Sequence, residues 1–274
     1  MPSKKPNFFE TISAAINDVI DHGFDSQKRI DDWIFQIRKS AHATLVPEVI
    51  VQQSVAAALS QIYQRQIQQD HILEFHPGVS RFQLQMVKPK LRNELDRRIM
   101  ANASLIKLNR EAAIERTIQR FAGWSTSIPA GGSRAVDKKE VKDSIRKSMS
   151  QLPFEERRVA IDQGMKFISS LNNIIAVDRG ALAGVWHSKW RRPGYNFRVE
   201  HKERDLHVYA VRDNWALNQG LMKVGPDGYT DQITMPGEEV YCTCAYRYVY
   251  SFNELPDNMI TEKGRKALER FAIS

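Results

Sequence analysis

The sequence predicts an α+β protein, in which a long and mostly helical N-terminal region precedes a small mixed α/β C-terminal domain. Up to Asp178, apolar residues recur at the three-and-four spacing of amphipathic helices. After Gly180 the chain is rich in tryptophan, tyrosine and turn residues, and short aromatic and β-branched runs favour strands. We therefore expect two domains, residues 1–180 and 181–274, with a hinge near residues 123–134.

The first helices are marked by capping residues as well as by apolar spacing. One is expected from residue 8 to Gly23, which ends it, and the next begins at Ser26, a good N-cap. Pro47 suits the first turn of a third helix, and the sequence His-Pro-Gly at residues 76–78 ends this pattern. These signals predict three helices before residue 76.

Three more helices are predicted over residues 90–121, 138–150 and 153–178, the last opening with a proline in its first turn. Strands are expected at residues 185–190, 206–212 and 240–250, and a short helix at residues 261–271 closes the chain.

Composition excludes several classes of protein. With 42% hydrophobic and 26% charged residues the chain is typical of a globular protein, and since no continuous apolar run of membrane-spanning length occurs, no membrane helix is expected.

The two cysteines, Cys242 and Cys244, are too close in sequence for a favourable disulfide, which indicates a reducing compartment. The net charge of +8 is concentrated in residues 81–120 and 186–212, which favours a polyanionic partner. For the first stretch a solvated helix face is the stronger interpretation, because its basic residues alternate with apolar ones at helical spacing.

Residues 186–256 hold a distinctive order of features. Trp186 and Trp190 frame a basic segment, a charged cluster follows, and a spacer with Pro236-Gly237 leads to Cys242-Thr243-Cys244. The charged cluster consists of His201, Arg204, Asp205 and His207. This order resembles the C-terminal domain of phage head morphogenesis proteins of the Mu F-like minor head family. The cluster here reads His-Lys-Glu-Arg-Asp, where many members of that family place Asp-x-Arg-Thr before the histidine.

The resemblance implies a structural protein of the phage virion, not an enzyme, and assigns no catalytic residue. Such a protein is a minor capsid component at the portal vertex or head interior, synthesised in the host cytoplasm. It contacts the portal protein and the major capsid protein, and it serves head assembly, DNA packaging or DNA ejection. Self-association is compatible with this role, and no membrane partner is expected.

Four side chains of the C-terminal domain have the donor types of a tetrahedral zinc site. They are His201, His207, Cys242 and Cys244. The alternative is that both cysteines are small buried packing residues and that a carboxylate holds His201. The packing alternative is preferred here, so no cofactor is expected, and zinc is the one cofactor that these donors make possible.

Six charged residues suggest an ion-pair network that joins the central and closing strands: Arg204, Asp205, Arg212, Asp213, Glu238 and Glu239. The alternative is an injected toxin-like enzyme of the RNase or ADP-ribosyltransferase type. Its site would use His201, Glu203, Arg204 and Tyr209.

Basic residues beside aromatic ones form the last candidate site. Lys189, Arg191, Arg192 and Arg198 lie near Trp186, Trp190, Tyr195 and Phe197. Cations with stacking platforms favour nucleic acid, here packaged double-stranded DNA contacted without sequence preference. A second alternative function is therefore a non-specific DNA-binding module in the head, and the structural alternative is a sheet whose aromatic residues pack in its core.

Overall fold

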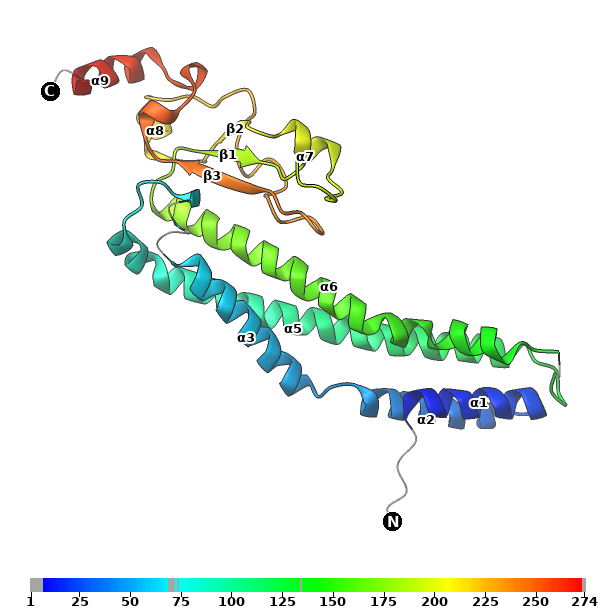
Figure 1. Ribbon diagram of the computed structural model, residues 1–274. Helices are drawn as coiled ribbons and strands as arrows, with labels where there is room; N and C mark the ends of the chain where they lie inside the picture. Colours follow the sequence, from blue (N-terminus) through cyan, green and yellow to red (C-terminus); the bar gives the residue numbers. More distant parts are fainter. Residues whose placement is uncertain (1–6, 69–71, 73, 134, 273–274) are drawn as a thin grey trace. The chain divides into compact units, whose positions relative to one another are not determined.

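The computed structural model describes residues 7–68, 72, 74–133 and 135–272, and it has the predicted α+β fold (Figure 1). The chain forms two compact units. Unit 1 comprises Met1–Ser54 and Asn102–Val159, and unit 2 comprises Val55–Ala101 and Ala160–Ser274. The predicted boundary near residue 180 marks the change from helix to sheet, whereas the compact units divide within helices.

Unit 1 contains α1 (Phe8–His22) and α2 (Gln27–Thr44). Asn7 caps α1 in a reciprocal pair with Glu10, and Gly23, whose φ of 71° suits glycine, ends the helix as predicted. Ser26 accepts a hydrogen bond from the Arg29 amide at the start of α2, so the predicted N-cap is confirmed. Local signals therefore fix both helix ends.

The core of unit 1 is almost entirely aliphatic and aromatic. Its fully buried members come from α1, α2, α5 (Arg81–Ser125) and α6 (Lys138–Asp178). Among them are Phe8, Ile16, Ile37, Ile114 and Phe121. Arg110 reinforces this packing, because its guanidinium pairs with Glu156 on α6 and donates to the Val46 carbonyl.

The loop predicted as a hinge is attached to α1. The amides of Gly131 and Ser133 donate to the carbonyls of His22 and Ile20, and Phe24 donates to Ile128. A side chain at Gly132 would meet the Ile20 carbonyl at 2.1 Å, so this close approach requires glycine. Residues 123–125 are thus the end of α5, and residues 126–133 form a loop docked on α1. The hinge stays a prediction.

The long helices are longer than predicted. α5 begins at Arg81 and includes Pro89, and α6 is one helix of 41 residues that includes Pro153, where two helices were expected. The packing explains both corrections: Leu84, Val87 and Leu91 are buried around Pro89, so tertiary contacts outweigh the lost backbone hydrogen bond.

Unit 2 contains α3 (Glu48–Gln66) from Val55 onward, the first part of α5, the last part of α6 and a three-stranded antiparallel sheet of order β2-β1-β3 (Figure 1). The strands are β1 (Ala183–His187), β2 (Val208–Ala210) and β3 (Ala245–Val249), all shorter than expected. α9 (Glu262–Ala272) matches the predicted closing helix.

The two faces of the sheet differ in chemistry. Trp186, Tyr209, Tyr246 and Tyr248 pack on one face with both cysteines, whereas the other face is aliphatic. Gly184 on β1 makes room for the Tyr246 ring, since a Cβ there would lie 3.0 Å from it. The aromatic face therefore depends on a glycine in its central strand.

One stretch of the chain meets a length-and-composition criterion for a membrane span, although no membrane helix is expected from the sequence. Gln27–Gln66 contains an 18-residue window of mean hydropathy 1.2, of which 11% is buried, and it passes by length and composition alone. The backbone is not continuous helix there, because Leu45–Pro47 separate α2 from α3. One such stretch does not by itself identify a membrane protein.

Candidate functional site

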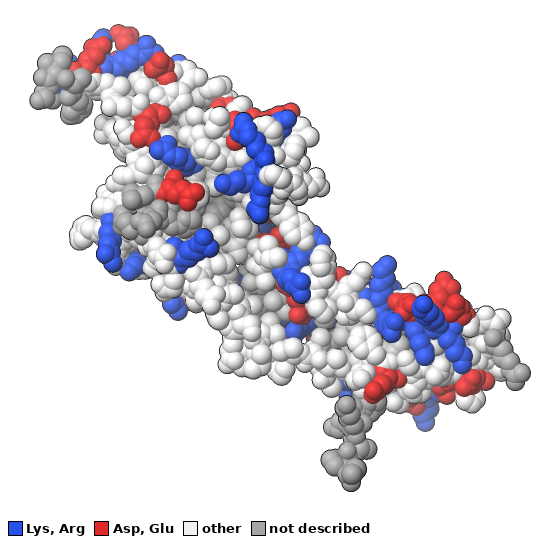
Figure 2. Space-filling view, in the orientation of Figure 1, with Lys and Arg blue, Asp and Glu red and all other residues white. Residues whose placement is uncertain are grey.

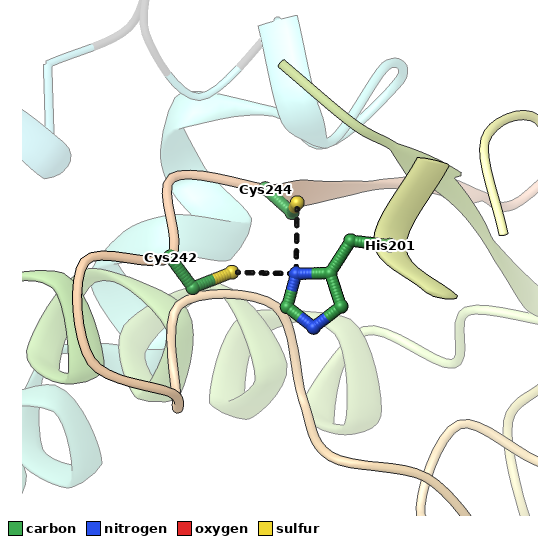
Figure 3. A group of neighbouring side chains, drawn as sticks. All are labelled: His201, Cys242 and Cys244. Carbon is green, nitrogen blue, oxygen red and sulfur yellow. Dashed lines mark hydrogen bonds between the residues drawn. The ribbon is translucent and has the colours of Figure 1, made fainter. Parts of the chain in front are cut away.

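A histidine and two cysteines from separate segments meet in unit 2 (Figure 3). His201 lies on α7 (Val199–Glu203), and Cys242 and Cys244 lie in the segment that leads into β3. The Nδ1 atom of His201 is 3.5 Å from the Cys242 Sγ and 3.7 Å from the Cys244 Sγ. The three side chains are 2%, 0% and 5% exposed. We call these three residues the His/Cys cluster.

The backbone around Cys242 holds its sulfur toward the histidine. Tyr241 has a φ of 60°, which turns the chain sharply, and the Cys242 amide donates to the Glu239 carbonyl at 2.9 Å. The Gly237 amide donates to the Cys242 Sγ at 3.3 Å. A sulfur that accepts an amide hydrogen bond is suited to carry negative charge.

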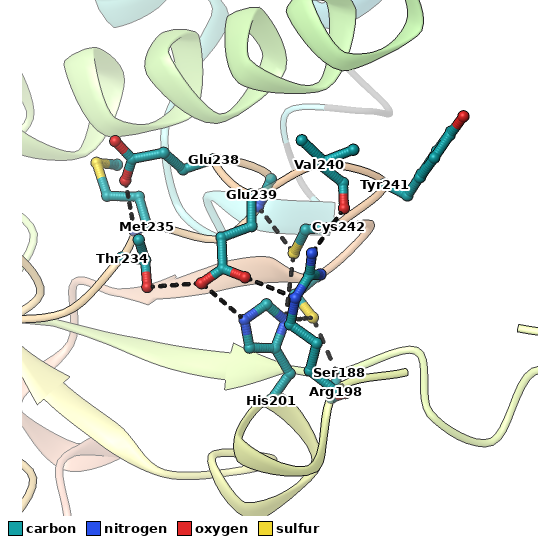
Figure 4. Close-up of polar contacts among 12 residues, drawn as sticks. Ser188, Arg198, His201, Thr234, Met235, Glu238, Glu239, Val240, Tyr241 and Cys242 are labelled. Carbon is teal, nitrogen blue, oxygen red and sulfur yellow. Dashed lines mark hydrogen bonds and ion pairs between the residues drawn. The ribbon is translucent and has the colours of Figure 1, made fainter. Parts of the chain in front are cut away.

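The second nitrogen of His201 faces a carboxylate (Figure 4). Its Nε2 lies 3.6 Å from the Glu239 Oε1, and among the described residues it has no hydrogen bond of normal length. Arg198 pairs with the other oxygen of Glu239 at 2.7 Å, and the Thr234 hydroxyl donates to Oε1 at 3.1 Å. Burial acts to raise the pKa of Glu239, but Thr234, Arg198 and His201 outweigh it and lower that pKa.

The two thiols shift each other's pKa in opposite directions. The hydrogen bond from Cys244 lowers the pKa of Cys242 to about 6, against the effect of burial, and the amide of Gly237 also contributes. The same pairing, together with burial, raises the pKa of Cys244. Cys242 is thus the more readily deprotonated of the two, and two cysteine sulfurs beside an imidazole are donors able to bind a soft or borderline cation.

Aromatic rings enclose the cluster. Trp186 is fully buried and meets the His201 ring edge-on, with 5.4 Å between ring centroids. Tyr246 contacts Trp186 in the same manner at 5.5 Å. The Trp186 Nε1 and the Tyr246 hydroxyl are buried without a hydrogen-bond partner in the described chain. The cluster thus lies in a predominantly apolar environment, which strengthens electrostatic interactions inside it.

One of the four sequence-predicted zinc ligands lies elsewhere. His207 is half exposed, and its Nδ1 is 2.8 Å from Asp227, so it is not part of the His/Cys cluster. Glu239 is the other side chain beside His201, but it faces the Nε2 atom, on the side of the ring away from the two sulfurs. The alternative that a carboxylate holds His201 is thereby consistent with the geometry, and it is compatible with metal binding.

The six residues of the predicted ion-pair network are distributed over separate contacts. Asp205 pairs with Arg191, Arg212 with Asp231, and Glu239 with Arg198. The Glu238 carboxylate accepts a hydrogen bond from the Met235 amide. The Asp213 carbonyl accepts one from the Asn218 side chain. Arg204 lies 5.3 Å over the Trp186 ring, and its buried Nη1 has no hydrogen bond within the described residues. Local pairs replace the expected network.

The predicted DNA-binding residues divide into two groups. Lys189, Arg191 and Arg192 are exposed in the loop after β1, whereas Arg198 is half-buried and committed to Glu239. Trp190, not the buried Trp186, provides the aromatic surface: Arg191 lies 4.2 Å and Lys202 4.7 Å from its ring centre. Figure 2 shows acidic side chains interspersed among the basic ones on the visible face.

The basic residues of α5 are largely paired. Arg97 and Arg98 contact the buried Glu94, Arg92 pairs with Asp96, and Lys90 pairs with Asp178. Such pairing favours the helix-face explanation of the 81–120 charge excess over a DNA-binding one.

Sequence reasoning missed the contributions of Glu239 as the partner of His201 and of Gly237 as a donor to sulfur. The Gly-Glu-Glu segment before the Cys-x-Cys sequence was visible, but nothing in the spacing indicated that Glu239 faces the histidine. A comparison with protein families, curated proteins and solved structures finds no match to this chain.

Proposed function

We propose that this protein is an architectural component of a tailed-phage head, bound at the portal vertex and acting in head assembly, DNA packaging or ejection. One observation carries the proposal. The residues on which the resemblance to the Mu F-like minor head family rests, Trp186, His201, Cys242 and Cys244, are far apart in sequence yet meet in one buried cluster. Their spacing in the sequence therefore corresponds to a single structural unit.

The same geometry favours a structural role over the enzyme alternative. A catalytic base has to reach a substrate, but His201 and Tyr209 are 2% and 4% exposed, while Glu203 is exposed. Burial also raises the pKa of Tyr209. These side chains do not form an accessible acid–base pair, which supports a function based on binding.

The long helices offer surfaces for docking on a portal or capsid protein. Phe82 and Met86, one turn apart on α5, are 74% and 61% exposed. Exposed apolar side chains grouped on one helix face indicate a protein-binding surface.

Mass spectrometry of purified mature particles, compared with DNA-free proheads, tests the proposal directly. We expect the protein in both at low copy number, because a portal-associated component enters before DNA. Its absence from both particles would contradict the proposal.

Binding of the full chain to purified portal protein tests the docking surface. The double variant Phe82→Glu/Met86→Glu places charge on the apolar pair, and we expect portal binding to weaken by about tenfold or more. Gln85→Glu is the matched control, since it adds a charge at an exposed position of the same turn. Equal binding by all three proteins would place the docking surface elsewhere.

A contact with packaged DNA is supported by the cations around Trp190. Lys189→Glu/Arg192→Glu should weaken binding to duplex DNA and make it less salt-dependent, since each lost phosphate contact lowers the logarithmic salt slope by about 0.9. Lys147→Glu, an exposed change in unit 1, is the control. Unchanged affinity and slope in the double variant would exclude this surface as a DNA contact.

A further inference from the structure

The His/Cys cluster has the donor set and spacing of a metal centre. We propose that His201 Nδ1, Cys242 Sγ and Cys244 Sγ bind one zinc ion, and that Glu239 positions the histidine through its Nε2. The inference does not depend on the phage function, because it rests on the geometry of these four residues.

The distances fit a tetrahedral ion. With zinc–sulfur bonds of about 2.3 Å and zinc–nitrogen bonds of about 2.0–2.1 Å, the nitrogen–sulfur edge of a tetrahedron is about 3.5 Å. The two nitrogen–sulfur separations here are 3.5 and 3.7 Å, and all three donor atoms lie within 4.8 Å of one another. Zinc can therefore enter with small side-chain shifts.

The surroundings of His201 select the correct nitrogen. Because Nε2 faces the ionised Glu239, the proton of a neutral imidazole belongs on Nε2, and the lone pair of Nδ1 points at the two sulfurs. A carboxylate that holds the remote nitrogen of a histidine ligand is a recurrent feature of zinc sites. Arg198 and Thr234 in turn fix Glu239. Each layer of contacts thus orients the next toward the ion.

The donor types favour zinc over other common metal ions. Magnesium and calcium prefer oxygen ligands, whereas two thiolates and an imidazole suit zinc. Binding replaces the thiol protons, which pass to solvent. Three protein donors leave the fourth position of a tetrahedral ion to a water molecule. A hollow of about 300 Å³ is lined by Cys244 and Thr243. The ion would tie α7 to the segment before β3.

Metal analysis of the untagged full chain provides the test. The protein is stripped with a chelator, reconstituted with zinc and desalted, and we expect one zinc ion per chain. Cys242→Ser/Cys244→Ser should retain none. His207→Ala is the matched control, because this histidine lies outside the cluster and its loss should leave the zinc content unchanged.

Two further measurements keep the test decisive if the double variant folds poorly. Cobalt(II) added to the wild-type chain should give tetrahedral visible bands and sulfur-to-cobalt charge transfer. Glu239→Gln should bind one zinc with affinity lowered by about 10- to 100-fold in competition with a chelator. Absence of zinc and of the cobalt bands from the wild-type protein would overturn the proposal, and an unchanged affinity in Glu239→Gln would remove the positioning role.

Discussion

The cores of the two compact units are stabilised by different chemistry. In unit 1, α1 and α2 bury an aliphatic and aromatic core that contains Phe8, Ile37 and Phe121. In unit 2, strands of five, three and five residues carry a core of tryptophan, tyrosines, cysteines and histidine. Several polar atoms of this core are buried without a hydrogen-bond partner among the residues that the structure describes.

The difference shows what each unit requires of its residues. An aliphatic core tolerates substitutions that conserve volume, since its energy comes from burial and close packing. A core of polar aromatic rings and thiols depends on particular atoms meeting, because an unpaired buried polar group costs free energy. The stability of unit 2 should therefore depend on pH and on the loss of single polar atoms, whereas the stability of unit 1 should not.

The largest effect is expected from Phe121→Ala in unit 1. The ring is fully buried, so its removal leaves a cavity and should lower the free energy of unfolding by about 3–5 kcal/mol. Urea unfolding followed by circular dichroism measures this change. Phe35→Ala, at a position 66% exposed on α2, is the control and should shift it by about 0.5 kcal/mol or less. Similar losses in both variants would contradict the core assignment.

Acid should destabilise unit 2 through His76. Burial lowers the pKa of this fully buried histidine to about 4, against the hydrogen bond with Asn172. Unfolded histidine has a pKa of about 6.5, so between these values the unfolded chain binds the proton and the folded chain does not. Stability is complete above about pH 6.5 and falls toward pH 4, by about 3 kcal/mol in total.

Urea unfolding across this pH range measures the slope. His76→Gln cannot titrate, so its stability should fall less steeply between pH 6.5 and 4 than that of the wild-type chain. Parallel pH profiles for the two proteins would show that His76 is not held neutral.

The smallest effect contrasts two tyrosines of unit 2. The Tyr246 hydroxyl is buried and has no partner among the described residues, so Tyr246→Phe should leave stability unchanged or raise it by up to about 1 kcal/mol. The Tyr250 hydroxyl is 2.7 Å from the His76 Nδ1, so Tyr250→Phe should cost about 1 kcal/mol. Thermal unfolding compares them, and a loss in Tyr246→Phe would reveal a partner for its hydroxyl.

Much of the helical region could be predicted because its signals are local. Ser26 and Gly23 act within one turn, and the apolar spacing of α1 specifies its buried face directly. Pro153 was misread as a helix start, and the helix predicted from residue 90 in fact begins before Pro89. Whether a helix continues through a proline depends on packing on either side, here Leu84 and Leu91 around Pro89, and such contacts are not visible in the local sequence.

The sequence predicted which residue types form the candidate site, but not which particular residues come together in it. Cys242, Cys244 and His201 were identified, whereas His207 was included and Glu239 was assigned to an ion-pair network. The two histidines are six positions apart, and only the fold decides that α7 directs His201 inward while His207 meets Asp227. The prediction of the site was therefore limited by the unknown positions of these side chains in the fold, and not by the choice of donor types.

The division of α5 and α6 between the units has a consequence for synthesis on the ribosome. Residues 55–101 are translated early, but their partners in unit 2 are residues 160–274. Unit 1 has all its segments once residue 159 has emerged, while the first part of unit 2 still waits for the remaining chain. Co-translational folding should therefore complete the helical core first. A premature stop before residue 160 would release a chain in which the buried Leu84, Leu91 and Leu95 lack the rest of unit 2, and such a chain is exposed to aggregation or degradation.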